Sequence, residues 1–474
     1  MIEIDNNSKT PVYEQIYAQL RQQIIAGELP KGSRLSPTRT FAKDYHLSRN
    51  TVLSAYMQLQ SEGFIKSIQG SGFYVEELPE YKDVNHSEKQ KTFKNCEQEK
   101  PRYDFRYGLI EPNIYNIRGF RKAMKSAWDI LEDRQALYDD DPQGLFSLRQ
   151  AICEHLAQER GVEADPRYLL ITSGHHYSLQ LITSLLSKDE YTFYMEEPGH
   201  QDSREVFRKE GYKVYPLYVD ENGAIISRLK DIHNAIVYVT PSHQFPTGHI
   251  LPIGRRMKLL EWARNNNGYI IEDDYDSQLR YKERPIPSLH SLDQNERVIY
   301  FGSFSKSLSS DLRVSYVLLP PALKLLFDED RSYLNSPVSS FIQLTLSEYL
   351  HSGEYQRRIN SIRNLYRKKH NLIIDFFKNN YDDSIKIYGA GGGTHLLLEI
   401  ATDLKKEEII KRFLQNDIGV YPCDIYWADK AKAKDNQILI AYSGIRLEEL
   451  NEYLLQMKKV LDQIINKSNI MKKR

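Results

Sequence analysis

The first 75 residues place apolar side chains at a helical period. A helix is predicted over 11–25, where every fourth residue on one face is apolar: Val12, Ile16, Leu20 and Ile24. Gly27 ends this helix, and a turn at 29–32 leads to a second predicted helix that opens at 36–39. Pro37 suits the first turn of the second helix, because a backbone N–H would have no helical partner there.

A third helix and a hairpin complete this segment. Ser48 is a suitable N-cap for a helix that runs to Gly63, and extended runs at 64–67 and 72–75 flank a turn at 69–71. Three helices followed by a glycine-containing hairpin predict a winged helix-turn-helix.

The pattern changes twice further along the chain. Residues 77–101 are rich in Glu, Lys, Gln and Asn and have no apolar period, which predicts a solvated linker. From 102 to 474, short apolar runs alternate with amphipathic helical stretches, which favours an α/β domain with a mostly parallel sheet. We therefore expect domains at 1–76 and 102–474. The expected strands are 168–172, 191–195, 213–217, 235–240, 268–272, 298–302 and 314–318.

Composition narrows the class of protein. The chain has 474 residues, of which 41% are hydrophobic, so it holds enough apolar material for a large core. No apolar run reaches the ~20 residues that span a bilayer, and the first residues lack the features of a signal peptide. A cytoplasmic location without a membrane partner is therefore expected. Cys96, Cys153 and Cys423 lack metal-ligand spacing, which predicts reduced thiols and no metal site.

Local charge is more informative than the formal net charge of +0. Between Lys31 and Lys66 there are six basic residues and two acidic ones, which gives a patch suited to phosphate contact. A solvated basic surface is the alternative, and charge alone does not separate the two.

The first segment resembles the GntR family of bacterial regulators. The resemblance rests on Pro11-Val-Tyr-Glu-Gln-Ile16, Gly32-Ser-Arg34-Leu35, Thr38-Arg39, Ser48-Arg49-Asn50-Thr51-Val52, Ala55-Tyr56, Glu62-Gly63 and Gly70-Ser71-Gly72-Phe73. It implies double-stranded DNA as a partner, with the third helix in the major groove. Arg34 and Arg39 are expected to hold the DNA backbone, and Gly70 and Gly72 let the wing approach closely. The expected contacts of the third helix are Ser48, Arg49, Asn50 and Thr51.

A second group of candidate residues lies where three predicted strands end. The run at 298–302 leads into Ser303, Ser305 and Lys306. A lysine desolvated at a strand end has a lowered pKa, and its neutral amine can form a Schiff base with an aldehyde. Arg313 and the two serines are suited to bind a phosphate.

Two further strand ends add an anion site and a carboxylate. The run at 170–172 passes through Gly174 into a helix that begins near His175 and His176, where backbone amides can bind an anion. The run at 268–272 ends in acidic residues, and a carboxylate there can keep a pyridine nitrogen protonated.

These strand ends together resemble the fold type I aminotransferases, and their fusion to a GntR-like head resembles the MocR/GabR subfamily over essentially the whole chain. Further matching stretches are 138–144, 197–199, 240–248 and 272–276. The resemblance implies a smaller C-terminal α+β subdomain and pyridoxal 5'-phosphate as cofactor. It makes Lys306 the Schiff-base lysine, Asp273 the partner of the pyridine nitrogen and Tyr275 a contact of the ring oxygen.

The remaining cofactor contacts also follow from the resemblance. The phosphate is expected among Gly174, His175, Ser303 and Arg313. The expected site further includes His176, His200, His243, Ser305 and Tyr138, the last donated across the interface of a homodimer.

The sequence departs from the aminotransferase pattern around the cofactor ring. Phe245 replaces the asparagine expected before Pro-Thr-Gly, which leaves the ring oxygen to His243, Gln244 or Tyr275. His200 replaces the expected stacking aromatic residue and offers a smaller ring.

The substrate side departs further. Asp202 stands where GABA-responsive members would have an arginine for the substrate carboxylate, and the run at 437–442 contains no arginine. Arg204 and Arg446 are possible substitutes.

Two functions fit these observations. In the first, a regulator senses pyridoxal phosphate or a small amino compound and controls genes of vitamin B6 or of amino-acid and amine metabolism. In the second, a working aminotransferase carries a DNA-binding appendage. The head and the missing carboxylate anchors favour the regulator, with Schiff-base exchange or partial transamination in place of steady turnover.

The identity of the effector stays open between pyridoxal phosphate and an amino acid or amine, and Asp202 favours pyridoxal phosphate. A DNA-binding protein with a degenerate second domain is a third hypothesis, which requires that no cofactor binds. A homodimer would suit an operator with paired half-sites.

Overall fold

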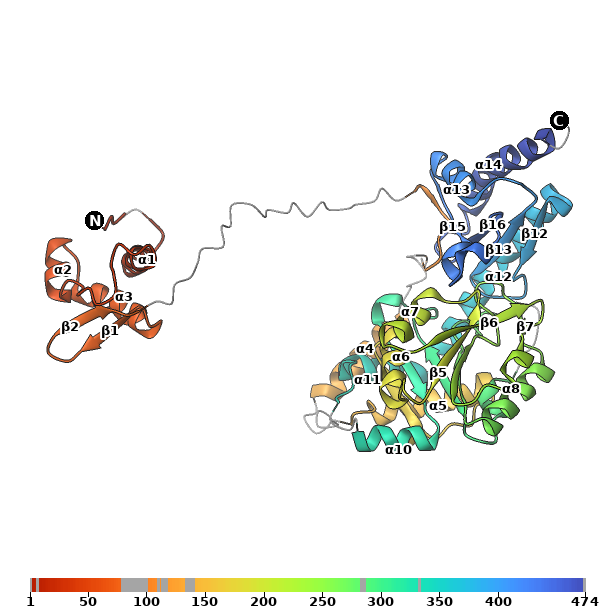
Figure 1. The fold of residues 1–474 in the computed structure, drawn as a ribbon, viewed down its shortest axis with the longest axis horizontal. Helices are drawn as coiled ribbons and strands as arrows, with labels where there is room; N and C mark the ends of the chain where they lie inside the picture. Colours follow the sequence, from red (N-terminus) through yellow and green to blue (C-terminus); the bar gives the residue numbers. More distant parts are fainter. Residues whose placement is uncertain are drawn as a thin grey trace. The chain divides into compact units, whose positions relative to one another are not determined.

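The computed structural model divides into two compact units, Met1–Glu97 and Gln98–Arg474 (Figure 1). It describes residues 2–5, 8–77, 101–108, 111, 118–132, 141–281, 287–330 and 334–471. Most of the expected linker and Tyr138 lie outside the described residues, so the predicted domain boundaries stay predictions.

The first unit contains the expected three helices and hairpin. Helices α1 (Val12–Ile25), α2 (Thr38–Asp44) and α3 (Arg49–Ser61) precede strands β1 (Ile65–Ile68) and β2 (Gly72–Val75), which pair antiparallel. Their apolar faces meet in a core that includes Ile16, Leu20, Val52, Tyr56 and Leu59. The winged helix-turn-helix is confirmed. Pro37 is the N-cap residue of α2 and not part of its first turn.

The second unit is built on an eight-stranded sheet in the order β4-β11-β10-β9-β8-β5-β6-β7. This sheet contains all seven expected strands: β4 (Leu169–Thr172), β5 (Thr192–Glu197), β6 (Val214–Asp220), β8 (Ala235–Val239), β9 (Tyr269–Asp273), β10 (Val298–Ser303) and β11 (Ser315–Leu318). Strands β6, β5, β8, β9 and β10 pair parallel, whereas β11 is antiparallel to both of its neighbours and β7 (Gly223–Ala224) is antiparallel to β6.

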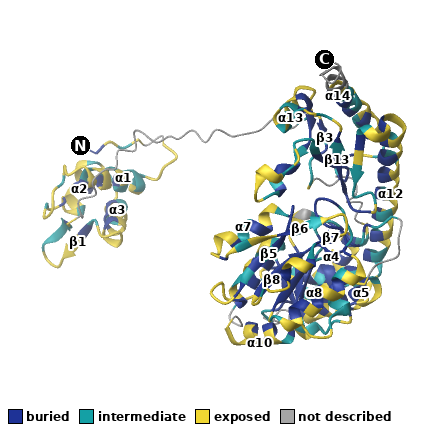
Figure 2. Ribbon diagram, turned by 45° about the vertical axis from the view of Figure 1, so that its right-hand side comes forward, coloured by how far each residue is buried: buried dark blue, intermediate teal, exposed yellow. Residues whose placement is uncertain are grey.

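Helices cover both faces of this sheet, so β8 is buried throughout and β9 is buried up to its last residue (Figure 2). Side chains alternate between the two faces along each strand: on β9, Ile270 packs with one helical layer and Ile271 with the other. One layer contains α6 (His175–Leu185), α7 (Gln201–Lys209) and α10 (Pro321–Asp330). The opposite layers contain α4 (Arg118–Glu132), α5 (Phe146–Arg160), α8 (Ile253–Asn265), α9 (Leu289–Leu292) and α11 (Ser340–His351).

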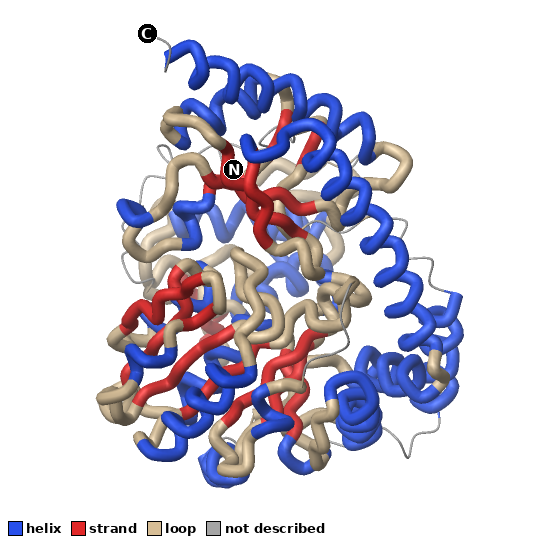
Figure 3. The backbone as a smooth tube through the Cα atoms, turned by 90° about the vertical axis from the view of Figure 1, so that its right-hand side faces the viewer, coloured by secondary structure: helices blue, strands red, loops and turns tan. Residues whose placement is uncertain are grey.

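The expected C-terminal subdomain follows the long helix α12 (Glu354–Tyr381) (Figure 3). Its four-stranded antiparallel sheet consists of β12 (Ile385–Tyr388), β13 (His395–Ile400), β15 (Tyr421–Pro422) and β16 (Gln437–Ala441). Helices α13 (Lys406–Gln415) and α14 (Leu450–Met471) belong to the same part. Strand β3 (Tyr103–Asp104) pairs parallel with β14 (Ile418–Gly419). No helix in the described part of the chain is long and apolar enough to cross a membrane.

Truncation of the β9 core should cost far more stability than truncation of a surface isoleucine. Ile270 and Ile271 are 0% exposed, whereas Ile253 is 58% exposed. Ile270→Ala or Ile271→Ala should lower the free energy of unfolding by about 2–5 kcal/mol, because each leaves a cavity in the core. Ile253→Ala should change it by less than about 0.5 kcal/mol. Urea denaturation followed by circular dichroism measures both, and equal losses would contradict this packing.

Candidate functional site

Lys306 lies in the loop after β10, with its amine against the ring of Tyr107. The Nζ atom is 4.0 Å from the centroid of that ring, a distance at which a cation and an aromatic face attract. Burial lowers the pKa of Lys306 to about 8, although the carboxylates of Asp276 and Asp273 raise it. Near pH 8 about half of the amine is therefore neutral, which is its nucleophilic form.

Asp273 is the last residue of β9, directly beside β10 in the sheet. The hydroxyl of Tyr238 on β8 donates a hydrogen bond to Oδ2 of Asp273, and His175 Nδ1 lies 3.9 Å from the same oxygen. Burial raises the pKa of Asp273 to about 6, so the group is mostly a carboxylate at pH 7. Asp273 can therefore hold a proton on a nitrogen base placed against it.

The ring of His175 lies beside Asp273. Its Nε2 atom is 2.8 Å from Ser203 Oγ, and the ring of His200 lies 5.8 Å away, edge-on. Burial lowers the pKa of both histidines to about 4, which makes them neutral at pH 7. We expected His175 at the phosphate. Its backbone does open helix α6, but its side chain lies on the Asp273 side of the site.

Gly174 and Arg313 come together at the N-terminus of α6. Gly174 has φ +100°, and a Cβ atom there would lie 2.8 Å from Nη2 of Arg313, so glycine is what leaves room for the guanidinium. The exposed Arg313 and the first turn of α6 are both suited to bind an anion.

The two predicted serines lie at the same edge of the sheet. Register pairs Ser303 with Ser315, and Ser315 with Thr172 at the end of β4. Ser303 Oγ accepts hydrogen bonds from the Ser305 N–H at 3.1 Å and from Ser315 Oγ at 3.2 Å. Thr172 precedes Gly174 by two residues, and Ser315 follows Arg313 by two residues. A turn rich in hydroxyl groups therefore lies at the end of the sheet from which the chain leads to Gly174 and Arg313. His176 is exposed, and its Nε2 lies 3.8 Å from Asp202.

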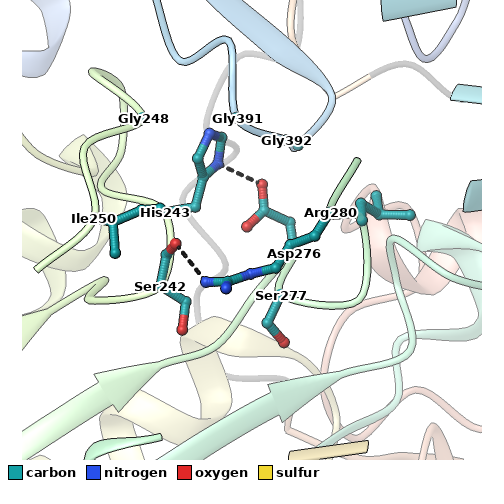
Figure 4. A pocket seen from close by; sticks show the side chains of 11 residues that line it. Ser242, His243, Gly248, Ile250, Asp276, Ser277, Arg280, Gly391 and Gly392 are labelled. Atoms are coloured by element: carbon teal, nitrogen blue, oxygen red, sulfur yellow. Dashed lines mark hydrogen bonds and ion pairs between the residues drawn. The ribbon is translucent and has the colours of Figure 1, made fainter. Parts of the chain in front are cut away.

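His243 and Tyr275 are also brought together. The Tyr275 hydroxyl donates to the His243 carbonyl at 3.0 Å, and His243 Nδ1 lies 2.8 Å from Oδ2 of Asp276. Figure 4 shows the His243 ring reaching toward Asp276, with the loop at 391–392 nearby. His243, Asp276 and residues 391–392 border a cavity of ≈ 20 Å³, which is space for about one water molecule.

The arginines considered for a substrate carboxylate are engaged elsewhere. Arg204 is buried, and its Nη2 donates to Glu197 Oε2 at 2.8 Å and to the Tyr426 carbonyl at 3.0 Å. Arg446 is half exposed, and its Nη1 lies 4.0 Å from Glu449. Leu439 lies on β16, the strand where an arginine was looked for, and packs in a small apolar cluster. The other buried members of this cluster are Phe245, Leu397, Cys423 and Tyr426.

Sequence reasoning missed several neighbours of Lys306 and Asp273. Tyr238 lies within the continuous buried run of β8 and carries no motif, and Tyr107 belongs to a segment far from Lys306 in sequence. His395 opens β13 and packs 5.4 Å from the Tyr107 ring. Only His395 had a local indication, the glycine run 391–393 before it, which permits a close approach of the backbone.

The predicted DNA-contacting residues lie at the start of α3, on α2, on the wing and, for Arg34, in the segment between α1 and α2. Ser48 caps α3, accepting a hydrogen bond from the Thr51 N–H at 3.0 Å. Arg49 and Asn50 are exposed in the first turn, and Arg34 and Arg39 are exposed as well. Within the described residues no ion pair engages these three arginines. Arg34 lies against Gly72 of the wing, where a Cβ atom would be 3.4 Å from its Nε.

Comparison with known proteins agrees with both units. Residues 12–75 match the family of bacterial regulatory proteins called the gntR family, and residues 113–427 match aminotransferase class I and II. LysN, an α-aminoadipate aminotransferase from Thermus thermophilus solved in complex with N-(5'-phosphopyridoxyl)-L-leucine, is 25% identical, with a TM-score of 0.66. The match covers 77% of this chain and 93% of LysN.

Two relatives match along nearly their whole length. YhdI of Bacillus subtilis, an uncharacterized HTH-type transcriptional regulator, is 34% identical over 96% of this chain and 97% of its own. The HTH-type pyridoxine biosynthesis transcriptional regulator PdxR of Corynebacterium glutamicum is 28% identical over 94% of both chains. The chain belongs to the MocR/GabR subfamily of GntR-family transcriptional regulators, in which a winged helix-turn-helix is joined to a fold type I aminotransferase domain.

Proposed function

We propose that this regulator binds pyridoxal 5'-phosphate at Lys306 and that ligand binding at this site changes how its head binds DNA. The observation that carries the proposal is the lysine amine with a pKa of about 8, held beside Asp273 on the neighbouring strand. The controlled genes would serve vitamin B6 or amine metabolism.

The residues present fit this cofactor. Arg313 and the N-terminus of α6 would hold the phosphate, and the close approach of Arg313 to Gly174 supports this assignment. Asp273 would hold a proton on the pyridine nitrogen, and Tyr275 would contact the ring oxygen. When bound, the cofactor supplies an aldehyde carbon that accepts amines.

Sensing accounts for the site better than steady transamination. Arg204 can bind a substrate carboxylate only if it leaves Glu197 buried without its partner, which is costly. The pyridoxine biosynthesis regulator PdxR among the relatives supports a regulatory role connected with vitamin B6. Sustained conversion of an amino acid and a keto acid by the purified protein would favour the enzyme instead.

The head would bind DNA as part of a homodimer, which suits paired half-sites. Arg49 and Asn50 at the start of α3 would face the major groove, and Arg34 beside Gly72 would reach the DNA backbone near the wing. Tyr138 would complete the cofactor site of the other subunit.

Lys306→Ala should abolish covalent attachment of the cofactor. After incubation with pyridoxal phosphate, reduction with borohydride and dialysis, the native protein should keep one reduced cofactor on the peptide that contains Lys306. The variant should keep none, because the nucleophilic amine is gone. Lys324→Ala is the matched control, since Lys324 is a buried lysine paired with Asp328. Mass spectrometry measures the adduct, and an adduct on another lysine of the variant would count against the assignment.

Cofactor uptake should depend on pH through Lys306. Below pH 8 the amine is mainly protonated, so the rate of covalent uptake by cofactor-free protein should rise about tenfold per pH unit as the neutral form grows. The rate should level off above pH 8, since the pKa of Lys306 is lowered to about 8. Stopped-flow absorbance measures this rate. A rise that continues to pH 10, as for an ordinary lysine, would contradict a buried amine.

Arg49→Ala should weaken DNA binding and reduce its salt dependence. Loss of one phosphate contact should lower the slope of log affinity against log salt concentration by about 1. Lys9→Ala removes the same charge from an exposed position outside the basic stretch and should leave the slope unchanged. Footprinting upstream of the neighbouring genes, with and without pyridoxal phosphate, defines the DNA fragment. Fluorescence anisotropy then measures the slope, and equal slopes for Arg49→Ala and Lys9→Ala would exclude a phosphate contact by Arg49.

A further inference from the structure

Two buried histidines near Lys306 each have one ring nitrogen without a hydrogen-bond partner among the described residues. These atoms are Nε2 of His243 and Nδ1 of His395. His243 is 6% exposed and His395 is 0% exposed. A buried polar atom without a partner costs free energy, and this cost disappears when a ligand supplies the missing partner.

The other nitrogen of each ring determines what the unpartnered atom can do. His395 Nε2 lies 3.3 Å from the Pro246 carbonyl, which can only accept, so the proton is on Nε2 and Nδ1 has a lone pair. Burial, with His243 and Lys306 nearby, holds the pKa of His395 well below its usual value. His243 Nδ1 lies 2.8 Å from the Asp276 carboxylate, which can only accept, so Nδ1 carries a proton and Nε2 is the ring nitrogen left to meet a ligand.

These acceptors lie close to the proposed attachment point of the cofactor. The ring of Tyr107 contacts both groups: the His395 ring is 5.4 Å from it, and the amine of Lys306 lies 4.0 Å from its centroid. The rings of His243 and His395 are 5.3 Å apart. One nitrogen from each, together with a carboxylate oxygen of Asp276, lies within 4.8 Å of the others.

The charged groups of this region disfavour a carboxylate ligand. Asp273 and Asp276 are the carboxylates that act on Lys306. Arg160 and Arg204, packed against the same loops, are ion-paired with Asp274 and Glu197, and Arg280 donates a hydrogen bond to the carbonyl of Ser242. Negative charge and bare acceptors favour a cationic ligand that carries hydrogen-bond donors.

We propose that the effector is a small amine that carries a second donor, an amino or a hydroxyl group, and no carboxylate, and that His395 Nδ1 and His243 Nε2 accept this second donor. The proposal rests on the function proposed above and narrows its effector. The apolar cluster of Phe245, Leu397, Cys423, Tyr426 and Leu439 borders this region and suits the methylene groups of such a ligand.

A matched set of ligands tests the proposal on the full chain saturated with pyridoxal phosphate. Isothermal titration compares 3-aminopropan-1-ol and 1,3-diaminopropane with propylamine, which lacks the second donor, and with β-alanine, which replaces it by a carboxylate. At least one of the first two should bind about tenfold more tightly than propylamine, and β-alanine should bind less tightly than propylamine. The alcohol and the diamine distinguish the two kinds of donor. Tighter binding of β-alanine than of propylamine, or no preference for either of the first two ligands over propylamine, would overturn the proposal.

Variants of His395 show whether the histidines cause the preference. His395→Leu keeps bulk but removes the acceptor, so the preference over propylamine should fall below about threefold while propylamine binds as before. His395→Asn offers an acceptor oxygen near the position of Nδ1 and should restore part of the preference. His290→Leu is the control, because His290 is also largely buried with an unpartnered Nδ1. An unchanged preference in His395→Leu would refute the role of His395.

Two further measurements on each preparation separate this proposal from the one on which it rests. The absorbance of the bound cofactor reports the Lys306 site, and anisotropy with operator DNA reports the head. If both are normal and the ligand preference is absent, only the effector proposal fails. If the cofactor does not bind to the native protein, both proposals fail. Native-like cofactor absorbance in His395→Leu also shows that this variant is folded.

Discussion

Parallel pairing of β8, β9 and β10 is the constraint on which the site depends. It brings Tyr238, Asp273 and the loop that carries Lys306 to one edge of the sheet, although they come from three separate segments. Side chains alternate between the two faces of a strand, so a shift of one residue in the register of β9 against its neighbours would move each of its side chains to the opposite face of the sheet. Such a slip would turn the Asp273 carboxylate away from the Tyr238 hydroxyl. The packing that stabilises the sheet therefore also fixes the geometry of the acid and the amine.

The parts of the site that lie in continuous stretches could be predicted from the sequence. An apolar strand that ends in Asp273, and another that leads to Ser303 and Lys306, indicate both the strand and its functional end. The parts that depend on distant segments could not be predicted. Tyr107 reaches Lys306 from the start of the second unit, and Tyr238 looks like any strand residue until its hydroxyl meets Asp273.

Side-chain direction was equally hard to predict. The sequence indicated that His175 opens a helix at an anion site, but nothing local shows that its ring lies beside Asp273 and Ser203. The fate of Arg204 is similar. Its sequence position made it a candidate for a ligand carboxylate, whereas the fold buries it against Glu197 and a backbone carbonyl. A buried cation pairs with acceptors that the fold brings close to it, and these acceptors cannot be predicted from the residues beside it in the sequence.

The contact between Lys306 and Tyr107 has a mechanical consequence. Tyr107 lies on the short segment, residues 101–108, by which the chain enters the second unit, and this segment is held there by the pairing of β3 with β14. In sequence, β3 lies between Tyr107 and the residues that lead back to the first unit. A ligand that displaces the ring of Tyr107 would therefore strain a segment whose backbone is held within a few residues by β14.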